Sequence, residues 1–325
     1  MTAVIVPPPG TMNLASPRLG AEVIAASDDF FADKSRLIDP KDPVFIPGKY
    51  DANGKWMDGW ESRRRRGPGH DWCIVRLGRG GLVEAFEIDT RHFTGNYPPA
   101  ASIDVSESAE GDDFRPLVPL TALAGDSRRL IGLETAAKAR RIRLNIFPDG
   151  GVARLRVHGR FLFDPTEAGE APFDLLAAER GGRAIHANDS HFGVPENLLM
   201  PGRGIDMGDG WETRRRREPG HDWAILALGT AGRIERILID TAHFKGNYPE
   251  SFSLDAAFAP DRPDELLIVE SQFWQPFLAR TPLGPDAEHV FTSGFPADMP
   301  ITHVRLNIHP DGGVSRLRLF GRPIG

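Results

Sequence analysis

The sequence predicts an all-β protein made of two tandem, homologous, antiparallel β-sandwich domains of the jelly-roll type. The first observation behind this prediction is a repeat, because DGWESRRRRGPGHDW at 58–72 returns as DGWETRRRREPGHDW at 209–223. Self-similarity on this scale indicates a duplicated domain. The second observation is that 35 glycines and 28 prolines divide the 325 residues into short apolar runs, which is typical of strands separated by turns.

Two further blocks recur in the same order. IDTRHFTGNYP at 88–98 matches IDTAHFKGNYP at 239–249, at an offset of 151 residues. RLNIFPDGGVARLRVHGR at 143–160 matches RLNIHPDGGVSRLRLFGR at 305–322, at an offset of 162 residues. Three matching blocks per copy mean that the two copies fill almost the whole chain.

The blocks define the expected domains. We place the first domain at 12–163 and the second at 173–323. The segment between them, DPTEAGEAP at 164–172, is rich in proline, glycine and acidic residues and is predicted to be a linker. Domains of this size are ordinary for soluble proteins.

The strands are predicted from β-rich segments that flank glycine-rich turns. Segments 72–77 and 82–89 are joined by GRGG, which favours a hairpin, and 141–147 and 152–159 are joined by PDGG, which favours a second one. The second copy repeats both patterns. The strongest helix signal is FDLLAAERGG at 173–182, with an acidic first turn and a glycine stop.

Hairpin geometry predicts where the polar loops lie. The start of the first strand and the end of the second strand of an antiparallel hairpin lie at the same end of a sheet. We therefore expect GHD at 69–71 and the loop at 90–98 to gather at one end of the first domain, and their counterparts to do so in the second.

Composition excludes several classes of function. The net charge of −6 and the pI near 5.9 argue against a nucleic-acid partner. Cys73 is the single cysteine, so no intramolecular disulfide can form and a reducing compartment is favoured. The N-terminus lacks the pattern of a signal peptide, and no apolar run approaches the ~20 residues of a membrane span. We expect a cytoplasmic protein that does not enter a membrane.

The arginine runs are the most unusual local feature. If ESRRRR is extended, alternate arginines point to opposite sides, and one pair faces inward. A buried guanidinium needs a carboxylate partner or an anionic ligand, so two interpretations stay open: ion pairs at a domain or subunit interface, or a fork for a substrate carboxylate. The candidate substrate-binding arginines are Arg63, Arg65, Arg214 and Arg216.

Titratable residues near these runs are candidates for acid/base catalysis. A loop histidine beside a carboxylate suits proton transfer near neutral pH. The alternatives are that the aspartates cap turns, that the histidines bond loop carbonyls, and that the glutamates pair with the arginines. The candidate catalytic residues are Glu61, His70, Asp71 and His92 in the first copy and Glu212, His221, Asp222 and His243 in the second.

The GNYP loops add candidate binding groups. Asn96, Asn247, Tyr97 and Tyr248 could bind amide or ureido groups, although an asparagine after glycine is more often a turn former. Metal dependence stays unknown: histidine and aspartate could ligate a divalent ion if they converge, but no HxxxH pattern or cysteine cluster is present. There is also no GxSxG, GxGxxG or P-loop motif.

The paired blocks DGWE[ST]RRRRxPGHDW, IDTxHFxGNYP and RLNIxPDGGVxRLRxxGR closely resemble those of allantoicases, two-repeat enzymes of ureide catabolism. The resemblance covers about residues 12–323. More distantly, the strand pattern looks like the discoidin or galactose-binding jelly roll. The resemblance implies hydrolysis of allantoate to ureidoglycolate and urea, but it does not transfer a set of catalytic residues.

The implied substrate fits the residue types, because arginine suits its carboxylate and Asn or Tyr suits its ureido arms. A His/Glu/Asp pair or metal-bound water would supply proton transfer and activated water. Which copy is active stays open, as does a composite site between the domains. The alternatives are a tandem ligand-binding module without catalysis, and a ureidoglycolate lyase or another amidinohydrolase. A closed homo-oligomer is expected, as for most soluble metabolic enzymes.

Overall fold

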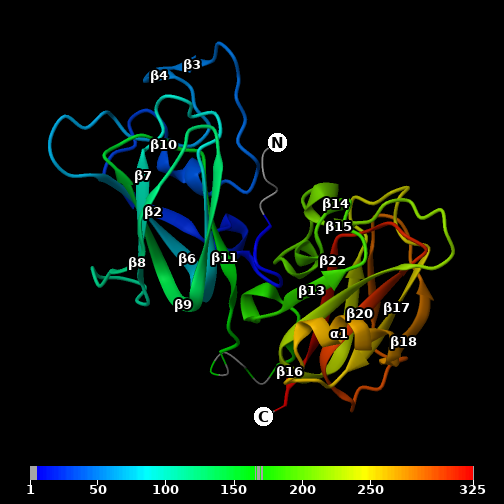
Figure 1. Cartoon of the computed structure of the whole chain (residues 1–325). Coiled ribbons are helices and arrows are strands. Elements are labelled where there is room, and N and C mark those ends of the chain that lie inside the picture. The colour runs from blue at the N-terminus through cyan, green and yellow to red at the C-terminus, as the bar shows by residue number, and fades with distance from the viewer. Residues whose placement is uncertain (1–5, 165, 167–168, 170, 325) are drawn as a thin grey trace. The chain divides into compact units, whose positions relative to one another are not determined.

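The computed structural model describes residues 6–164, 166, 169 and 171–324 (Figure 1). The chain divides into two compact units between Arg160 and Phe161. The strand pairings within the described residues are antiparallel, which confirms the predicted all-β fold. Part of the expected linker, 164–172, lies outside the described residues.

The first unit is built around one sheet with the strand order β1-β11-β6-β9-β7-β8, in which β2 also pairs with β6. Its strands alternate buried and half-buried side chains, as expected for strands with one face on a core. The strands are β1 (Met12–Asn13), β2 (Glu22–Ala26), β6 (Asp71–Asp89), β7 (Ala100–Ser106), β8 (Arg115–Ala122), β9 (Arg128–Phe147) and β11 (Arg154–Phe161).

The second unit repeats this order as β12-β22-β16-β20-β17-β18, with β13 and β19 also paired to β16. The strand corresponding to β9 is here divided into β19 and β20. The strands are β12 (Phe173–Asp174), β13 (Arg183–Ala187), β16 (Asp222–Asp240), β17 (Ser251–Ala257), β18 (Gln275–Pro282), β19 (Glu288–Phe291), β20 (Pro300–His309) and β22 (Arg316–Pro323).

Short strands at one end of each unit carry the repeated motif. In the first unit, β5 (Trp60–Glu61) pairs with β10 (Gly151–Val152). In the second unit, β15 lies between β14 and β21. Both tryptophans in these strands are fully buried. The second-unit elements and the small first-unit hairpin are β14 (Phe192–Gly193), β15 (Trp211–Glu212), β21 (Gly313–Val314), β3 (Tyr50–Asp51) and β4 (Gly54–Lys55).

The predicted hairpins at GRGG and PDGG are wrong. Strand β6 runs through GRGG, and both of its halves pair with β9, with a register shift between Arg76 and Gly81. PDGG connects β9 to β11, which are not neighbours in the sheet. A glycine run can produce a bulge or a bend as well as a tight turn, so the sequence signal did not distinguish these outcomes.

The expected gathering of loops at one end nevertheless holds. Asp71 N donates to Pro148 O, and Ala153 N donates to Asp89 O, so the two ends of β6 lie against the same short loop. A straight strand of 19 residues would span about 60 Å. Strand β6 therefore folds over at GRGG, and β9 follows it.

The predicted helix at 173–182 is also wrong. The segment forms β12 and then a single 3-10 turn, η4 (Ala178–Arg180), although Gly181 does end it with φ 92°. A segment this short, without a side-chain hydrogen bond at its N-terminus, does not offset the cost of nucleating an α-helix. The α-helix that the structure does contain is α1 (Asp264–Glu270), followed by η7 (Ser271–Phe273). No helix in the described part of the chain is long and apolar enough to cross a membrane.

Further 3-10 turns in the described residues connect the strands. They are η1 (Pro17–Leu19), η2 (Lys34–Ile38), η5 (Pro195–Leu199) and η6 (Met207–Asp209).

Candidate functional site

Each unit has a polar pocket at its loop end, and the two pockets are built from corresponding residues. The first has a volume of about 460 Å³ and the second about 610 Å³. Corresponding lining pairs are Glu61/Glu212, Ser62/Thr213, Arg64/Arg215, Gly95/Gly246, Asn96/Asn247, Tyr97/Tyr248, Pro148/Pro310, Asp149/Asp311 and Gly150/Gly312.

A carboxylate–amide pair forms the centre of each pocket. Asn96 Nδ2 donates to Glu61 Oε1 at 2.7 Å, and Asn247 Nδ2 donates to Glu212 Oε1 at 2.5 Å. Glu61 is buried, and burial raises its pKa while the bond from Asn96 opposes the shift. The structure thus brings together glutamates and asparagines that lie 35 residues apart in the chain.

Backbone contacts explain why three separate motifs meet here. Gly151 pairs with Glu61 across β10 and β5, and Gly151 N donates to Asn96 O at 2.7 Å. Gly150 has φ 139°, and a Cβ there would lie 2.8 Å from Asn96 O. PDGG therefore needs its glycines to approach the GNYP loop this closely. The second unit repeats both contacts through Gly312 and Gly313.

The arginine run is not extended strand, because β5 ends at Glu61. Arg63 is exposed and pairs with Asp28 at 2.6 Å, whereas Arg65 is half-buried and pairs with Asp71 at 2.5 Å. Arg64, between them, is exposed and lines the pocket. The guanidinium groups of the two predicted anchors are therefore held by carboxylates of the protein.

The second unit shows the same division. Arg214 pairs with Asp189 at 3.1 Å, and Arg216 pairs with Asp222 at 2.6 Å. Arg215 lines the pocket, and here Arg216 also reaches its wall. The buried carboxylates of Asp71 and Asp222 are candidate catalytic groups that the structure instead engages with arginine.

His70 and His221 lie beside the pockets, outside their lining. The ring of His70 stands against Phe147, with the ring centroids 4.4 Å apart. His221 Nε2 lies 3.1 Å from Asn307 Oδ1, and its ring stands against His309 at 4.6 Å.

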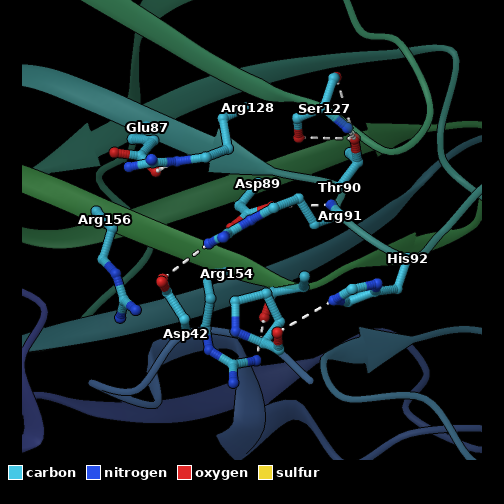
Figure 2. A network of polar contacts seen from close by, with 12 residues as sticks. Asp42, Glu87, Asp89, Thr90, Arg91, His92, Ser127, Arg128, Arg154 and Arg156 are labelled. Atoms are coloured by element: carbon cyan, nitrogen blue, oxygen red, sulfur yellow. Dashed lines mark hydrogen bonds and ion pairs between the residues drawn. The ribbon is translucent and has the colours of Figure 1, made fainter. Parts of the chain in front are cut away.

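His92 and His243 face a different loop. His92 Nε2 lies 3.1 Å from Pro43 O, next to a network in which Arg91 bridges Asp42 and Asp89 (Figure 2). His243 Nε2 lies 2.8 Å from Gly204 O in the same way. Both histidines have φ near 70°, a left-handed backbone conformation that belongs to the turn in which they lie. The structure does not bring them to the pocket lining.

Sequence reasoning missed several groups of this site. It did not select Asp149 and Asp311, although PDGG recurs in both copies, nor the middle arginines Arg64 and Arg215. The repeat was the signal that could have found the aspartates. Among the described residues, no three histidine, cysteine or carboxylate side chains gather closely enough to hold a metal ion.

Comparisons with known proteins identify relatives over the whole chain. The allantoicase repeat model matches residues 12–162 and 173–324. A probable allantoicase of Burkholderia mallei is 52% identical over 316 residues, which cover 95% of this chain and 94% of the relative. A probable allantoicase of Ralstonia nicotianae is 51% identical over 315 residues, with the same coverage of both chains. The crystal structure of Saccharomyces cerevisiae allantoicase is 34% identical, covers 96% of this chain and 93% of its own, and superposes with a TM-score of 0.80.

Proposed function

Because this chain belongs to the allantoicase family and hydrolyses allantoate to ureidoglycolate and urea, we propose that the polar pocket of each repeat is built to bind this substrate. The observation that supports this proposal is the matched set of an arginine, a glutamate and an asparagine in both pockets. Allantoate carries one carboxylate and two ureido arms on the same carbon, so it needs a cation and several hydrogen-bonding groups.

The arginine that lines each pocket binds the carboxylate of the substrate. Arg64 and Arg215 are exposed at the pocket, whereas their neighbours Arg63 and Arg65 are paired with aspartates. A planar guanidinium can form two parallel hydrogen bonds to a carboxylate. The geometry therefore favours Arg64 in the first pocket and Arg215 in the second, where Arg216 also lines the wall but is paired with Asp222.

The ureido arms are bound by the GNYP loop and the glutamate. Asn96 and Tyr97 line the first pocket, and Asn247 and Tyr248 line the second. Glu61 or Glu212 lies next to them and supplies the proton that the leaving nitrogen requires. In the overall reaction, the oxygen of water bonds to the central carbon, the bond from that carbon to one ureido nitrogen breaks, and the nitrogen leaves as urea.

The histidines have a supporting role in this proposal. His70 packs against Phe147 and His221 bonds Asn307 beside the pocket wall. His92 and His243 hold the turn before GNYP against another loop. This replaces the direct acid/base role that the sequence suggested for them.

Replacement of the glutamates tests the proposal. Glu61→Gln and Glu212→Gln keep the bond to asparagine but cannot carry a proton, so the variant in the active pocket should lose about 10²–10⁴ in kcat for urea release from allantoate. A double variant with near-normal turnover would refute the assignment. Assays with ureidoglycolate and guanidino compounds on the same variants would separate allantoicase activity from the lyase and amidinohydrolase alternatives.

The location and assembly of the enzyme are further parts of the proposal. The acidic net charge supports a protein without a nucleic-acid partner, and a single buried cysteine suits the reducing cytoplasm. A closed homo-oligomer would be typical of a metabolic enzyme. Light scattering at micromolar concentration should therefore give a mass well above that of the 35.7 kDa chain.

A further inference from the structure

The two pockets share their centre but differ at one rim. In the second unit, this rim is polar and is formed by neighbouring positions of β17, β18 and β20. Glu250 lines the pocket, Ser251 and His309 are opposite each other in the β17–β20 register, and Arg280 lies on β18. The corresponding residues of the first unit are Pro99, Ala100, Phe147 and Leu120.

Hydrogen bonds connect the polar rim into one cluster. Arg280 Nη2 donates to Glu250 Oε2 at 2.5 Å, and Arg280 Nε donates to Ser251 Oγ at 2.6 Å. Ser251 Oγ also donates to Glu250 Oε2 at 3.2 Å. The Glu250 carboxylate thus has two donors, and it keeps a free face toward the pocket, because 70% of its side chain is exposed.

The charges of the cluster keep this carboxylate ionised. The hydrogen bond from Arg280, then that from Ser251, lowers the pKa of Glu250. Burial, followed by the neighbouring His221 and Arg280, lowers the pKa of His309 to about 4. His309 is therefore neutral near pH 7 and adds no second positive charge beside Arg280. A carboxylate that stays ionised and lines the pocket has lone pairs that can accept a proton from water there.

The first unit cannot provide this group. Pro99 stands where Glu250 stands and has no titratable side chain, and Leu120 replaces Arg280 with an exposed apolar side chain. Phe147 replaces His309 and packs against His70. The first pocket therefore keeps the arginine, the asparagine and Glu61, but it lacks a second carboxylate in this position.

We propose that hydrolysis takes place in the pocket of the second repeat, with Glu250 as the base that activates water, and that the first pocket binds the substrate without cleaving it. This inference rests on the proposed function of the pockets. Glu250 takes a proton from water, whose oxygen bonds to the central carbon. As the carbon–nitrogen bond breaks, Glu212 gives a proton to the leaving nitrogen, and the proton on Glu250 returns to Glu212 through solvent. Arg280 is a positioning residue for Glu250.

Two variants in the second repeat test this assignment. Glu250→Gln should lower kcat for urea release by about 10²–10⁴ with little change in KM, because it removes the base and keeps the shape. Arg280→Leu copies the residue of the first repeat and should raise the pKa of Glu250. The acidic limb of the kcat–pH profile should then move to higher pH, which a purely structural role would not cause.

The charged groups that could influence the acidic limb of the kcat–pH profile come from all elements around the second pocket. Arg280, His309 and His221 belong to the cluster and its neighbours. The other charged groups in the pocket wall are Glu212, Arg215, Arg216 and Asp311. Arg280→Leu removes only the contacts of Arg280 and leaves these other groups in place. A shift of the acidic limb to higher pH would therefore report the loss of the Arg280–Glu250 pair.

A matched control exists in the first repeat. Leu120→Arg introduces the same side chain at the corresponding exposed position, and it should change kcat by less than about twofold, since no carboxylate lies at Pro99. Glu250 and Arg280 are exposed, so both variants should unfold at the temperature of the parent protein. Glu250→Gln with kcat within threefold of the parent, or an acidic limb unmoved by Arg280→Leu, would overturn the inference.

The glutamate variants separate this inference from the proposed function. Loss of activity in Glu212→Gln together with normal activity in Glu250→Gln would refute Glu250 as the base and leave the pocket assignment intact. A greater loss of kcat in Glu61→Gln than in Glu212→Gln would place catalysis in the first repeat and refute the inference. Normal activity in both Glu61→Gln and Glu212→Gln would refute the pocket assignment itself.

Discussion

The two repeats use the same framework to hold pockets with different rims. In both, a glutamate on a two-residue strand accepts a hydrogen bond from the asparagine of GNYP, and PDGG glycines allow the loops to touch. At the rim, Pro99 and Leu120 in one repeat correspond to Glu250 and Arg280 in the other. Close backbone contacts constrain the residues that the two pockets share. These rim residues are exposed side chains with few neighbours, so they can differ between the repeats.

Removal of the buried arginine should lower the free energy of unfolding by a similar amount in both repeats. Arg154 pairs with Asp58 at 2.9 Å, and Arg316 pairs with Asp209 at 2.7 Å; both arginines are 1% exposed. Arg154→Met and Arg316→Met remove the charged partner of each aspartate and the donor to several backbone carbonyls, which should cost about 3–5 kcal/mol of stability. Denaturant unfolding of both variants measures this cost. Strongly unequal losses would show that the repeats do not share one framework.

Acid should affect the first unit more than the second. Burial raises the pKa of Glu87, but the nearby His158 ring, whose Nε2 lies 3.5 Å from Glu87 Oε2, and the hydrogen bond from Arg128 outweigh it and lower the pKa to about 2. The corresponding residue in the second repeat is Leu238. Because the folded pKa is depressed, the stabilisation is complete above the ordinary pKa of 4.5 and is lost as the pH falls toward 2. The loss should be about 3 kcal/mol.

Denaturant unfolding of the parent protein and of Glu87→Gln between pH 5 and pH 2 checks this prediction (Figure 2 shows Glu87 beside Arg128). The variant should lack this part of the pH dependence. A parallel decline of the two proteins would contradict it.

The glycines at the contact between PDGG and GNYP should be equally intolerant of a side chain. Gly150 and Gly312 have φ of 139° and 130°, and an added Cβ would lie 2.7 Å from backbone atoms. Alanine at either position should cost on the order of 1–3 kcal/mol from backbone strain, and the close contact adds to this. Thermal unfolding measures the loss. Loss of urea release in Gly312→Ala but not in Gly150→Ala would support hydrolysis in the second pocket alone.

The smallest expected effect concerns the middle arginines. Arg215→Lys replaces a planar fork with a point charge and should raise KM for allantoate on the order of tenfold, with kcat little changed. Arg64→Lys should weaken binding at the first pocket by a similar factor, measured by calorimetric titration of allantoate into the inactive Glu212→Gln protein. Equal increases in KM from both variants would contradict a division between a binding pocket and a hydrolytic one.

The sequence could predict the framework better than the site. Repeats reveal the two β domains and the loops that meet at one end, because both depend on patterns that recur along the chain. The pairing of β6 and β9 could not be predicted, since a glycine run such as GRGG is compatible with a hairpin and with a folded-over strand. The choice among the arginines assumed an extended run, whereas β5 ends at Glu61, before the run begins.

The other parts of the site could not be predicted because they depend on three-dimensional contacts that residue types do not reveal. The sequence around Arg65 does not show that Asp71, six positions away, is buried and pairs with its guanidinium. Nothing near His92 shows that its ring turns toward Pro43, 49 positions away. Residue type and neighbourhood therefore could not show which aspartates pair with arginine and which histidines face another loop. The difference at the rim becomes visible only when strands β17, β18 and β20 are placed side by side.

The folded-over course of β6 along β9 has a consequence for local opening. Both halves of β6 bond to the same partner strand, so a fluctuation that separates one half strains the other through an unbroken backbone. Amide protons of 71–76 and 81–89 should then exchange with solvent as one cooperative block in the first unit. In the second unit, where β19 and β20 are separate, the two halves of β16 can open independently and should exchange at different rates.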